Sequence, residues 1–133
     1  MSATEVGSNA TDTEVFVYTG EGGEIPPQNV VRVRVDPSVT SIPYKAFNQR
    51  TKLAEVEPCE GVVEIGDRSF GWCDRSITKI NIPNSLSRIN NYAFALSLRT
   101  PICLHDDIES IGDCAFAACI FTNFRVPPLI TEL

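Results

Sequence analysis

The stretch that decides the fold is I-T-K-I-N-I-P-N-S-L-S-R-I-N-N-Y-A-F, residues 77–94. Its apolar pattern recurs on both sides along the chain, at a spacing of 22 to 24 residues. Three sets of positions share this spacing: Phe47, Phe70, Phe94 and Phe116; Ile42, Ile65, Ile89 and Ile111; and Val39, Val62, Leu86 and Ile108. A period in this range is the signature of stacked repeat units, so the sequence predicts a solenoid.

We call one repeat, which is one turn of the solenoid, a coil. Alignment on the phenylalanines predicts four coils, at about residues 33–52, 56–76, 80–99 and 102–122, and a partial fifth coil over 124–133. Residues 14–29 are predicted to form an N-terminal capping strand, because a solenoid must cover the open end of its first coil. Residues 14–133 therefore form the predicted repeat domain, and residues 1–13, which are small, polar and acidic, are predicted to be a disordered leader.

Each predicted coil begins with a short strand whose inward residues stand two apart, such as Ile80 and Ile82. It ends with a tight helical or 3-10 turn around an Ala-Phe or Ser-Phe pair. Asp67, Asn91 and Asp113 stand three residues before three of these phenylalanines. Asp and Asn are preferred at the first position of a helix, so we expect these residues to be N-caps.

The pattern apolar-x-x-Ile-x-Ile-Pro-x-x-apolar-x-x-Ile-x-x-x-Ala-Phe-x-x-Cys, carried best by residues 77–119, resembles the BspA-type leucine-rich repeat of bacterial surface antigens. The resemblance covers about residues 30–133. It implies an α/β fold class, a right-handed leucine-rich repeat solenoid of short parallel strands, and non-catalytic binding to proteins or surfaces. The chain departs from the pattern where Arg50 and Ser97 replace the cysteine after the aromatic, and where residues 97–101 break the register.

Charge is distributed unevenly along the chain, whose formal net charge is −6. Residues 1–24 contain five acidic residues and no Lys or Arg, and the remainder contains 12 acidic against 11 basic residues. A nearly neutral domain lacks the basic surface that phosphate backbones require, so we expect no nucleic-acid partner. No apolar run suggests a membrane span, and the N-terminus does not resemble a signal peptide. We therefore expect a cytoplasmic protein, or an extracellular one if the N-terminus is incomplete.

Five cysteines and one histidine are the candidates for thiol or metal chemistry. Cys73 and Cys119 share a register but fall two coils apart, as do Cys59 and Cys103, which is too far for a disulfide; only Cys114 and Cys119 could approach each other. Cys103 and His105 point the same way on one predicted strand, but a zinc or nucleophilic site needs further ligands or a base. We therefore expect no cofactor, no metal site and no catalytic residue.

The outward positions of the predicted sheet form two rows across the coils. The first row contains Arg32, Glu55, Lys79, Pro101 and Asn123, and the second contains Arg34, Glu57, Asn81, Cys103 and Arg125. Opposite charges in neighbouring coils favour simple cross-strand ion pairs. The alternative is that this face binds a partner, for which the candidate residues are Arg32, Arg34, Glu55, Glu57, Lys79, Asn81, Cys103, Asn123 and Arg125. Glu64 and Arg88 form a second outer pair with the same two interpretations.

Two further features bear on association. Trp72 stands outside the repeating core positions, where it is either an interface anchor or a half-buried cover over the turn. The incomplete fifth coil leaves an apolar C-terminal edge that could support self-association. The sequence thus favours a non-enzymatic module for protein–protein interaction; the alternatives are a cell-surface adhesion or structural repeat protein and, with less support, a thiol-dependent enzyme.

Overall fold

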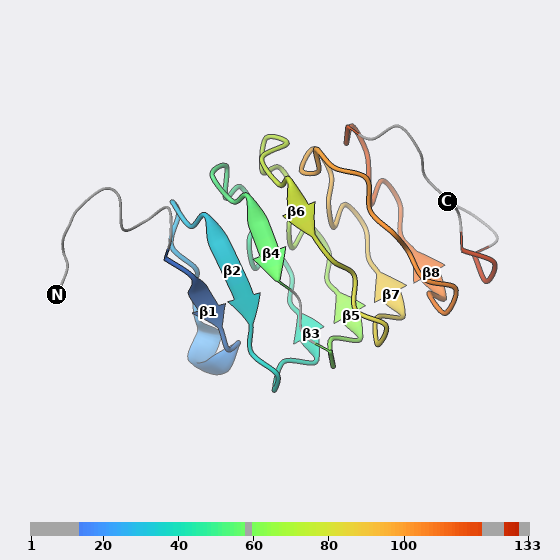
Figure 1. Ribbon diagram of the computed structural model, residues 1–133, viewed down its shortest axis with the longest axis horizontal. Coiled ribbons are helices and arrows are strands. Elements are labelled where there is room, and N and C mark those ends of the chain that lie inside the picture. The colour runs from blue at the N-terminus through green and yellow to red at the C-terminus, as the bar shows by residue number, and fades with distance from the viewer. Residues whose placement is uncertain (1–13, 58–59, 121–126, 131–133) are drawn as a thin grey trace, which may run out of the picture.

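The computed structural model describes residues 14–57, 60–120 and 127–130. Short strands dominate the described part, in which the one helical segment is a 3-10 helix near the N-terminus (Figure 1). The elements in order are β1 (Phe16–Tyr18), η1 (Glu21–Gly23), β2 (Arg32–Val35), β3 (Ser41–Ile42), β4 (Glu55–Glu57), β5 (Glu64–Ile65), β6 (Lys79–Ile80), β7 (Arg88–Ile89) and β8 (Ser110–Ile111).

These strands form two parallel four-stranded sheets, ordered β1-β2-β4-β6 and β3-β5-β7-β8. Neighbouring strands in each sheet come from successive coils, so the chain winds as a solenoid (Figure 1). In the first sheet Val56 pairs with Val33 on one side and with Ile80 on the other. In the second sheet the paired positions are Ile42, Ile65, Ile89 and Ile111. The predicted solenoid and its register are confirmed.

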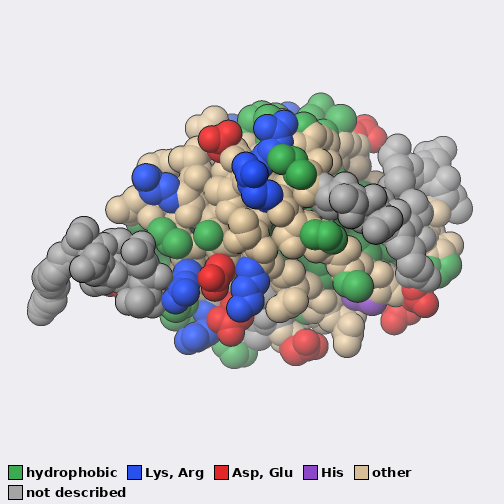
Figure 2. All heavy atoms as spheres, turned by 45° about the horizontal axis from the view of Figure 1, so that its top comes forward, with side chains coloured by type: hydrophobic (Ala, Val, Ile, Leu, Met, Phe, Trp, Pro, Cys, Tyr) green, Lys and Arg blue, Asp and Glu red, His purple; other side chains and the backbone are tan. Residues whose placement is uncertain are grey.

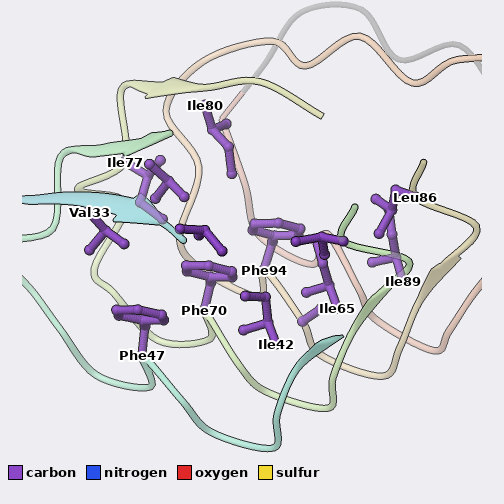
Figure 3. Packing of buried hydrophobic residues seen from close by; sticks show 14 of the residues in the cluster. Val33, Ile42, Phe47, Ile65, Phe70, Ile77, Ile80, Leu86, Ile89 and Phe94 are labelled. Carbon is purple, nitrogen blue, oxygen red and sulfur yellow. The ribbon is translucent and has the colours of Figure 1, made fainter. Parts of the chain in front are cut away.

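A column of phenylalanines fills the core between the sheets and the turns. The ring of Phe70 stacks on Phe47 at a centroid distance of 5.1 Å and on Phe94 at 5.3 Å, with interplanar angles of 1° and 3°. Phe116 continues the column 5.6 Å beyond Phe94, and the parallel rings of the first three are seen in Figure 3. At the N-terminal end Tyr18 packs edge-on against Phe47 at 5.2 Å. The column thus joins all four coils through identical contacts.

The segment that contains each phenylalanine takes a different form from the helical turn expected. In the first coil alternate backbone N–H groups donate to the next coil, from Lys45, Phe47 and Gln49 to Asp67, Ser69 and Gly71. The N–H groups between them close turns three residues back within the coil, as from Asn48 to Lys45. We call this segment the turn ladder; it satisfies the backbone between coils as a sheet does, so no helix forms.

Asp67, Asn91 and Asp113 were expected as helix N-caps, and that expectation is wrong because no helix follows them. The side chains of Asp67 and Asn91 act between coils instead. Oδ1 of Asp67 accepts a hydrogen bond of 3.1 Å from the backbone N–H of Asn91, and Oδ1 of Asn91 accepts one of 2.7 Å from that of Asp113. Short Asx side chains at this position therefore link each coil to the next, which is why the sequence repeats them.

The turn ladder places two non-glycine residues of each coil in the left-handed backbone region. These are Lys45, Gln49, Arg68, Trp72, Tyr92, Leu96, Cys114 and Ala118, with φ between 55° and 60°. The left-handed conformation costs an L-residue roughly 1–2 kcal/mol relative to glycine. The regular repetition of these eight positions shows that their strain belongs to the fold itself, whereas Asp74 and Arg75, also at positive φ, have no counterparts in the other described coils.

This strain predicts opposite effects for two neighbouring alanines. Ala118→Gly removes the left-handed penalty at an exposed position, but glycine also makes the unfolded chain more flexible, which favours unfolding. We expect the net result to be a rise of about 0.5–1 kcal/mol in the free energy of unfolding. Ala117→Gly, where φ is not positive, should lower the free energy of unfolding by about 0.5–1 kcal/mol. Chemical denaturation of both variants checks the pair. Two changes of the same sign would contradict the assigned backbone.

The N-terminal side of the first coil is covered by β1, which pairs in parallel with β2. Arg50, at the position that holds Cys73 in the next coil, donates through Nη2 to the carbonyl of Pro26 at 2.8 Å. Its Nη1 donates to the carbonyl of Asn48 at 2.8 Å. No coil precedes the first one in the described stack, so position 50 has no phenylalanine carbonyl of an earlier coil to bind. The longer Arg50 side chain reaches the carbonyl of Pro26 instead. This explains the departure at Arg50.

Glu24 closes the turn that follows β1. Its Oε1 accepts hydrogen bonds from the backbone N–H of Thr19 at 2.8 Å, from the Thr19 hydroxyl and from the backbone N–H of Gly20. These donors stabilise the carboxylate, and the Thr19 N–H bond makes the largest contribution to lowering the pKa of Glu24 below its ordinary value of 4.5.

A lowered folded-state pKa means that the carboxylate stabilises the fold above its unfolded pKa and loses this effect as the pH falls through its folded pKa. Glu24→Gln should therefore be less stable than wild type at pH 7, by less than about 1 kcal/mol because the group is only half-buried and solvent screens it. The gap between the two proteins should close as the pH falls below the ordinary Glu pKa and through the lowered folded pKa. Melting temperatures across this pH range test the prediction, and a stability gap that does not depend on pH would contradict it.

The predicted break in register after Ser97 is visible in the fourth coil. Residues 100–104 form no strand, and just before them an isolated bridge pairs Ile77 with Leu98.

Farther along the chain, Ile130 donates its N–H to the carbonyl of Pro127 at 3.0 Å, as Leu86 does to Pro83. Pro127 is fully buried and Ile130 packs partly against the core. Residues 1–13, 58–59, 121–126 and 131–133 lie outside the described residues, and so do the predictions that concern them.

Candidate functional site

The outward face of the β1-β2-β4-β6 sheet carries charged side chains in the rows predicted. Glu55 pairs with Arg32 and with Lys79 in the strand register, and Glu57 pairs with Arg34. Nε of Arg32 lies 3.6 Å from Oε1 of Glu55, and Nε of Arg34 lies 3.4 Å from Oε1 of Glu57. Figure 2 shows a compact mixed group of basic and acidic side chains on the molecular surface. We call this face the charged sheet face.

These ion pairs are too exposed to contribute much to stability. The side chains of Arg34 and Glu57 are 54% and 65% exposed, and those of Arg32 and Glu55 are 37% and 38% exposed. Exposed pairs of this kind stabilise a fold by about 0–1 kcal/mol each. The cross-strand pairs are therefore real, yet they leave most of the surface of the four side chains available to solvent or to a partner.

The charged sheet face is hollowed. A concave space of about 350 Å³ is lined by these four side chains, by Lys79 and Asn81, and by Val15, Val33 and Val56. Val15 and Val17 continue the two rows on β1, because Val17 pairs with Arg34, and Val17 is 41% exposed. The two valines were missed in the sequence, although their alternation with Phe16 and Tyr18 was a signal that could have found them.

Of the remaining candidate residues of this face, Cys103 is the one that the structure describes. Cys103 is exposed and lies in a segment without strand structure. Its place in the second row stays a prediction, because no strand pairing of the described residues joins it to Asn81. Asn123 and Arg125 lie outside the described residues. In the described part of the chain Lys79 has no ion-pair partner within 4 Å.

The second sheet carries one outward ion pair, between Arg88 Nη2 and Glu64 Oε1 at 3.5 Å. The amide of Asn90 donates to Oε2 of Glu64 at 2.6 Å. This hydrogen bond is the main reason that the pKa of Glu64 is lowered, and Arg88 adds to the effect. The carboxylate is thus already bound by its own neighbours, so this pair serves mainly to join two coils.

The cysteines after the phenylalanines fill a repeated packing position. Sγ of Cys73 donates to the carbonyl of Phe47 at 3.4 Å, and Sγ of Cys119 donates to that of Phe94 at 3.0 Å. The hydroxyl of Ser97 donates to the carbonyl of Phe70 in the same way. Burial raises the pKa of the Cys73 thiol above its ordinary value. These groups link successive coils, and in the described part of the chain Cys73, Cys103, Cys114 and Cys119 are free thiols.

Cys103 and His105 are not joined by a hydrogen bond in the described part of the chain. Nδ1 of His105 accepts a hydrogen bond from the backbone N–H of Asp107 at 3.1 Å, and Nε2 lies 3.1 Å from the carbonyl of Pro83. Both ring nitrogens are therefore engaged by the backbone, with Nε2 as the donor. Among residues 14–57, 60–120 and 127–130, no three His, Cys, Asp or Glu side chains are grouped to hold a metal ion.

These environments predict how the thiols react. Cys73, buried and with a raised thiol pKa, should be alkylated only when the protein unfolds, because the thiolate is the reactive form. Cys103 and Cys114 are exposed and should react at the rate of an ordinary free thiol. Mass spectrometry of iodoacetamide-treated protein measures the rates site by site. Labelling of Cys103 much faster than a model thiol would favour an enzyme over a binding module.

Trp72 is half-buried over the turn ladder. Its ring stacks on Tyr92 at a centroid distance of 5.5 Å, and the guanidinium of Arg68 lies 4.9 Å from the centre of the same tyrosine ring. The contacts join the second and third coils. Trp72 therefore covers the turns, which is the simpler of its two interpretations.

Comparison with known families agrees with this architecture. The family model of the BspA type leucine rich repeat region matches residues 28–133, with six copies. The chain belongs to this family of leucine-rich repeat proteins. Comparisons with curated proteins and with solved structures give no match. In the described part of the chain, no helix has the length and hydrophobicity that a membrane crossing needs.

Proposed function

We propose that the protein is a non-enzymatic module that binds another protein through the charged sheet face. The hollow of this face carries the proposal, because it brings six charged or amide side chains to one accessible surface beside the apolar Val15. Its ion pairs contribute little to folding, so their arrangement is free to serve recognition. Repeat solenoids commonly bind partners through such extended faces.

Affinity capture tests this proposal directly. Wild-type protein is compared with a variant in which Arg32, Glu55 and Lys79 are each reversed in charge, using native lysate from the source cells. We expect the variant to lose partners that the wild type retains. The matched control reverses Glu64 and Arg88, an ion pair on the other sheet, and should keep those partners. Identical partner lists for wild type and the first variant would refute the assignment of this face.

Two alternatives remain open to experiment. A cell-surface adhesion or structural role is supported by the repeat family alone and would require the protein outside the cell. Fractionation of the source cells tests this role against the expected cytoplasmic location.

Self-association through the C-terminal edge would appear as a concentration-dependent mass in analytical ultracentrifugation. A protein that is monomeric at all concentrations would remove the second alternative.

A further inference from the structure

The charged sheet face has an ordered sequence of chemical character along the solenoid axis. The outward pair at the β1 end is apolar: Val15, just before β1, lines the hollow, and the exposed Val17 on β1 pairs with Arg34. The pair on β2 is basic and the pair on β4 is acidic. Lys79 on β6 comes next, followed in the same hollow by Asn81. A complementary partner must therefore offer apolar, acidic, basic and acidic groups in that order.

Groups on this face remain available to such a partner. The ion pairs of Arg32 and Arg34 both run through Nε. Among the described residues, the terminal Nη groups of these two arginines form no hydrogen bond, and Lys79 has no ion pair. A guanidinium with free Nη groups can bind a carboxylate of the partner while its Nε keeps its own pair.

The spacing of the strands selects the shape of the partner. Neighbouring strands lie about 4.8 Å apart, so the four strands present their pairs at that interval. On an α-helix, residues three or four apart on one face are separated by about 4.5–6 Å, which matches the interval strand for strand. Same-face residues of an extended strand are about 6.7 Å apart and cannot meet every coil.

From these observations we infer that the charged sheet face binds an α-helix of a partner protein, laid along the solenoid axis across β1, β2, β4 and β6. The helix presents an apolar residue to Val15 and Val17, an acidic residue to Arg32 and Arg34, a basic residue to Glu55 and Glu57, and an acidic residue to Lys79. The hollow between the two outward rows receives the helix. This inference rests on the proposed function and specifies its partner.

Designed peptides test the inference against a charge-exchanged protein. Peptide P is an alanine-based helix whose facing residues read apolar, acidic, basic, acidic; peptide Q has the same composition but reads apolar, basic, acidic, acidic. The variant combines Arg32→Glu, Arg34→Glu, Glu55→Arg and Glu57→Arg, which keeps the net charge and the cross-strand pairs. Fluorescence anisotropy at low salt measures the affinity of each peptide for each protein.

We expect wild type to prefer P over Q by about tenfold and the variant to reverse the preference, with both preferences reduced at high salt. Equal binding of P and Q, or the same preference in both proteins, overturns the inference. A version of P with a central proline, which breaks the helix, should lose binding; if it binds as well as P, the helical occupant is overturned. If lysate capture shows face-dependent partners while P fails to bind, the inference falls and the proposed function stands.

Discussion

Replacing Phe94 with alanine is expected to lower the free energy of unfolding by about 3–5 kcal/mol. The side chain is fully buried and its ring is stacked between Phe70 and Phe116, at centroid distances of 5.3 Å and 5.6 Å. Truncation removes the transfer free energy of the ring, leaves a cavity and breaks the column in its middle. Because repeat stability depends on contacts between neighbours, we expect much of so short a stack to unfold together.

The matched control for this variant is Tyr44→Ala. Tyr44 is also an aromatic of a turn segment, but it is 60% exposed, so its removal should change stability by less than about 0.5 kcal/mol. Denaturant titration followed by circular dichroism measures both variants. A Phe94→Ala protein that melts within a degree or two of wild type would show that the assigned register is wrong.

The second large effect is expected at Ser97, which is fully buried. Its Oγ accepts a hydrogen bond of 3.1 Å from the backbone N–H of Cys73 and donates to the carbonyl of Phe70. Ser97→Ala leaves a buried N–H without its acceptor and a carbonyl without one donor. We expect a loss of about 1–3 kcal/mol in the free energy of unfolding.

Ser97→Cys provides the informative comparison, because cysteine occupies the same position in the second and fourth coils. A thiol at position 97 can donate to the carbonyl of Phe70 as Cys73 donates to that of Phe47, and its sulfur is a weak acceptor for the Cys73 N–H. The loss should be less than half that of the alanine variant. Equal losses in thermal denaturation would show that the hydrogen bonds of this position contribute nothing measurable.

The solenoid and its core could be predicted because three apolar registers slip together. Val39, Ile42 and Phe47 each recur after the same intervals, and only a stack of equal coils places all three sets on neighbouring strands. The paired charges of Arg32 with Glu55 and of Arg34 with Glu57 followed from the same register. The solenoid and its core positions, which depend only on this periodicity, could therefore be predicted from the sequence.

Features that depend on contacts between coils were not predictable in the same way. An Asp or Asn before Ala-Phe is compatible with a helix start, and only the neighbouring coil shows that the backbone of Phe47 bonds to Ser69 instead. Periodicity predicted a strand through Cys103, but residues 100–104 form none, although β8 continues the second sheet in the same coil. The hollow of the charged sheet face depends on how far the side chains of adjacent strands project from the sheet, and the sequence pattern does not give this.

The most direct test of the account is an NMR measurement of contacts between phenylalanine rings in protein with selectively labelled phenylalanine. A stack of equal coils predicts ring-to-ring nuclear Overhauser effects from Phe47 to Phe70, from Phe70 to Phe94 and from Phe94 to Phe116, and none from Phe47 to Phe94. Contacts in any other order, or rings with no contact to one another, would contradict the stacked coils and the charged sheet face that depends on them.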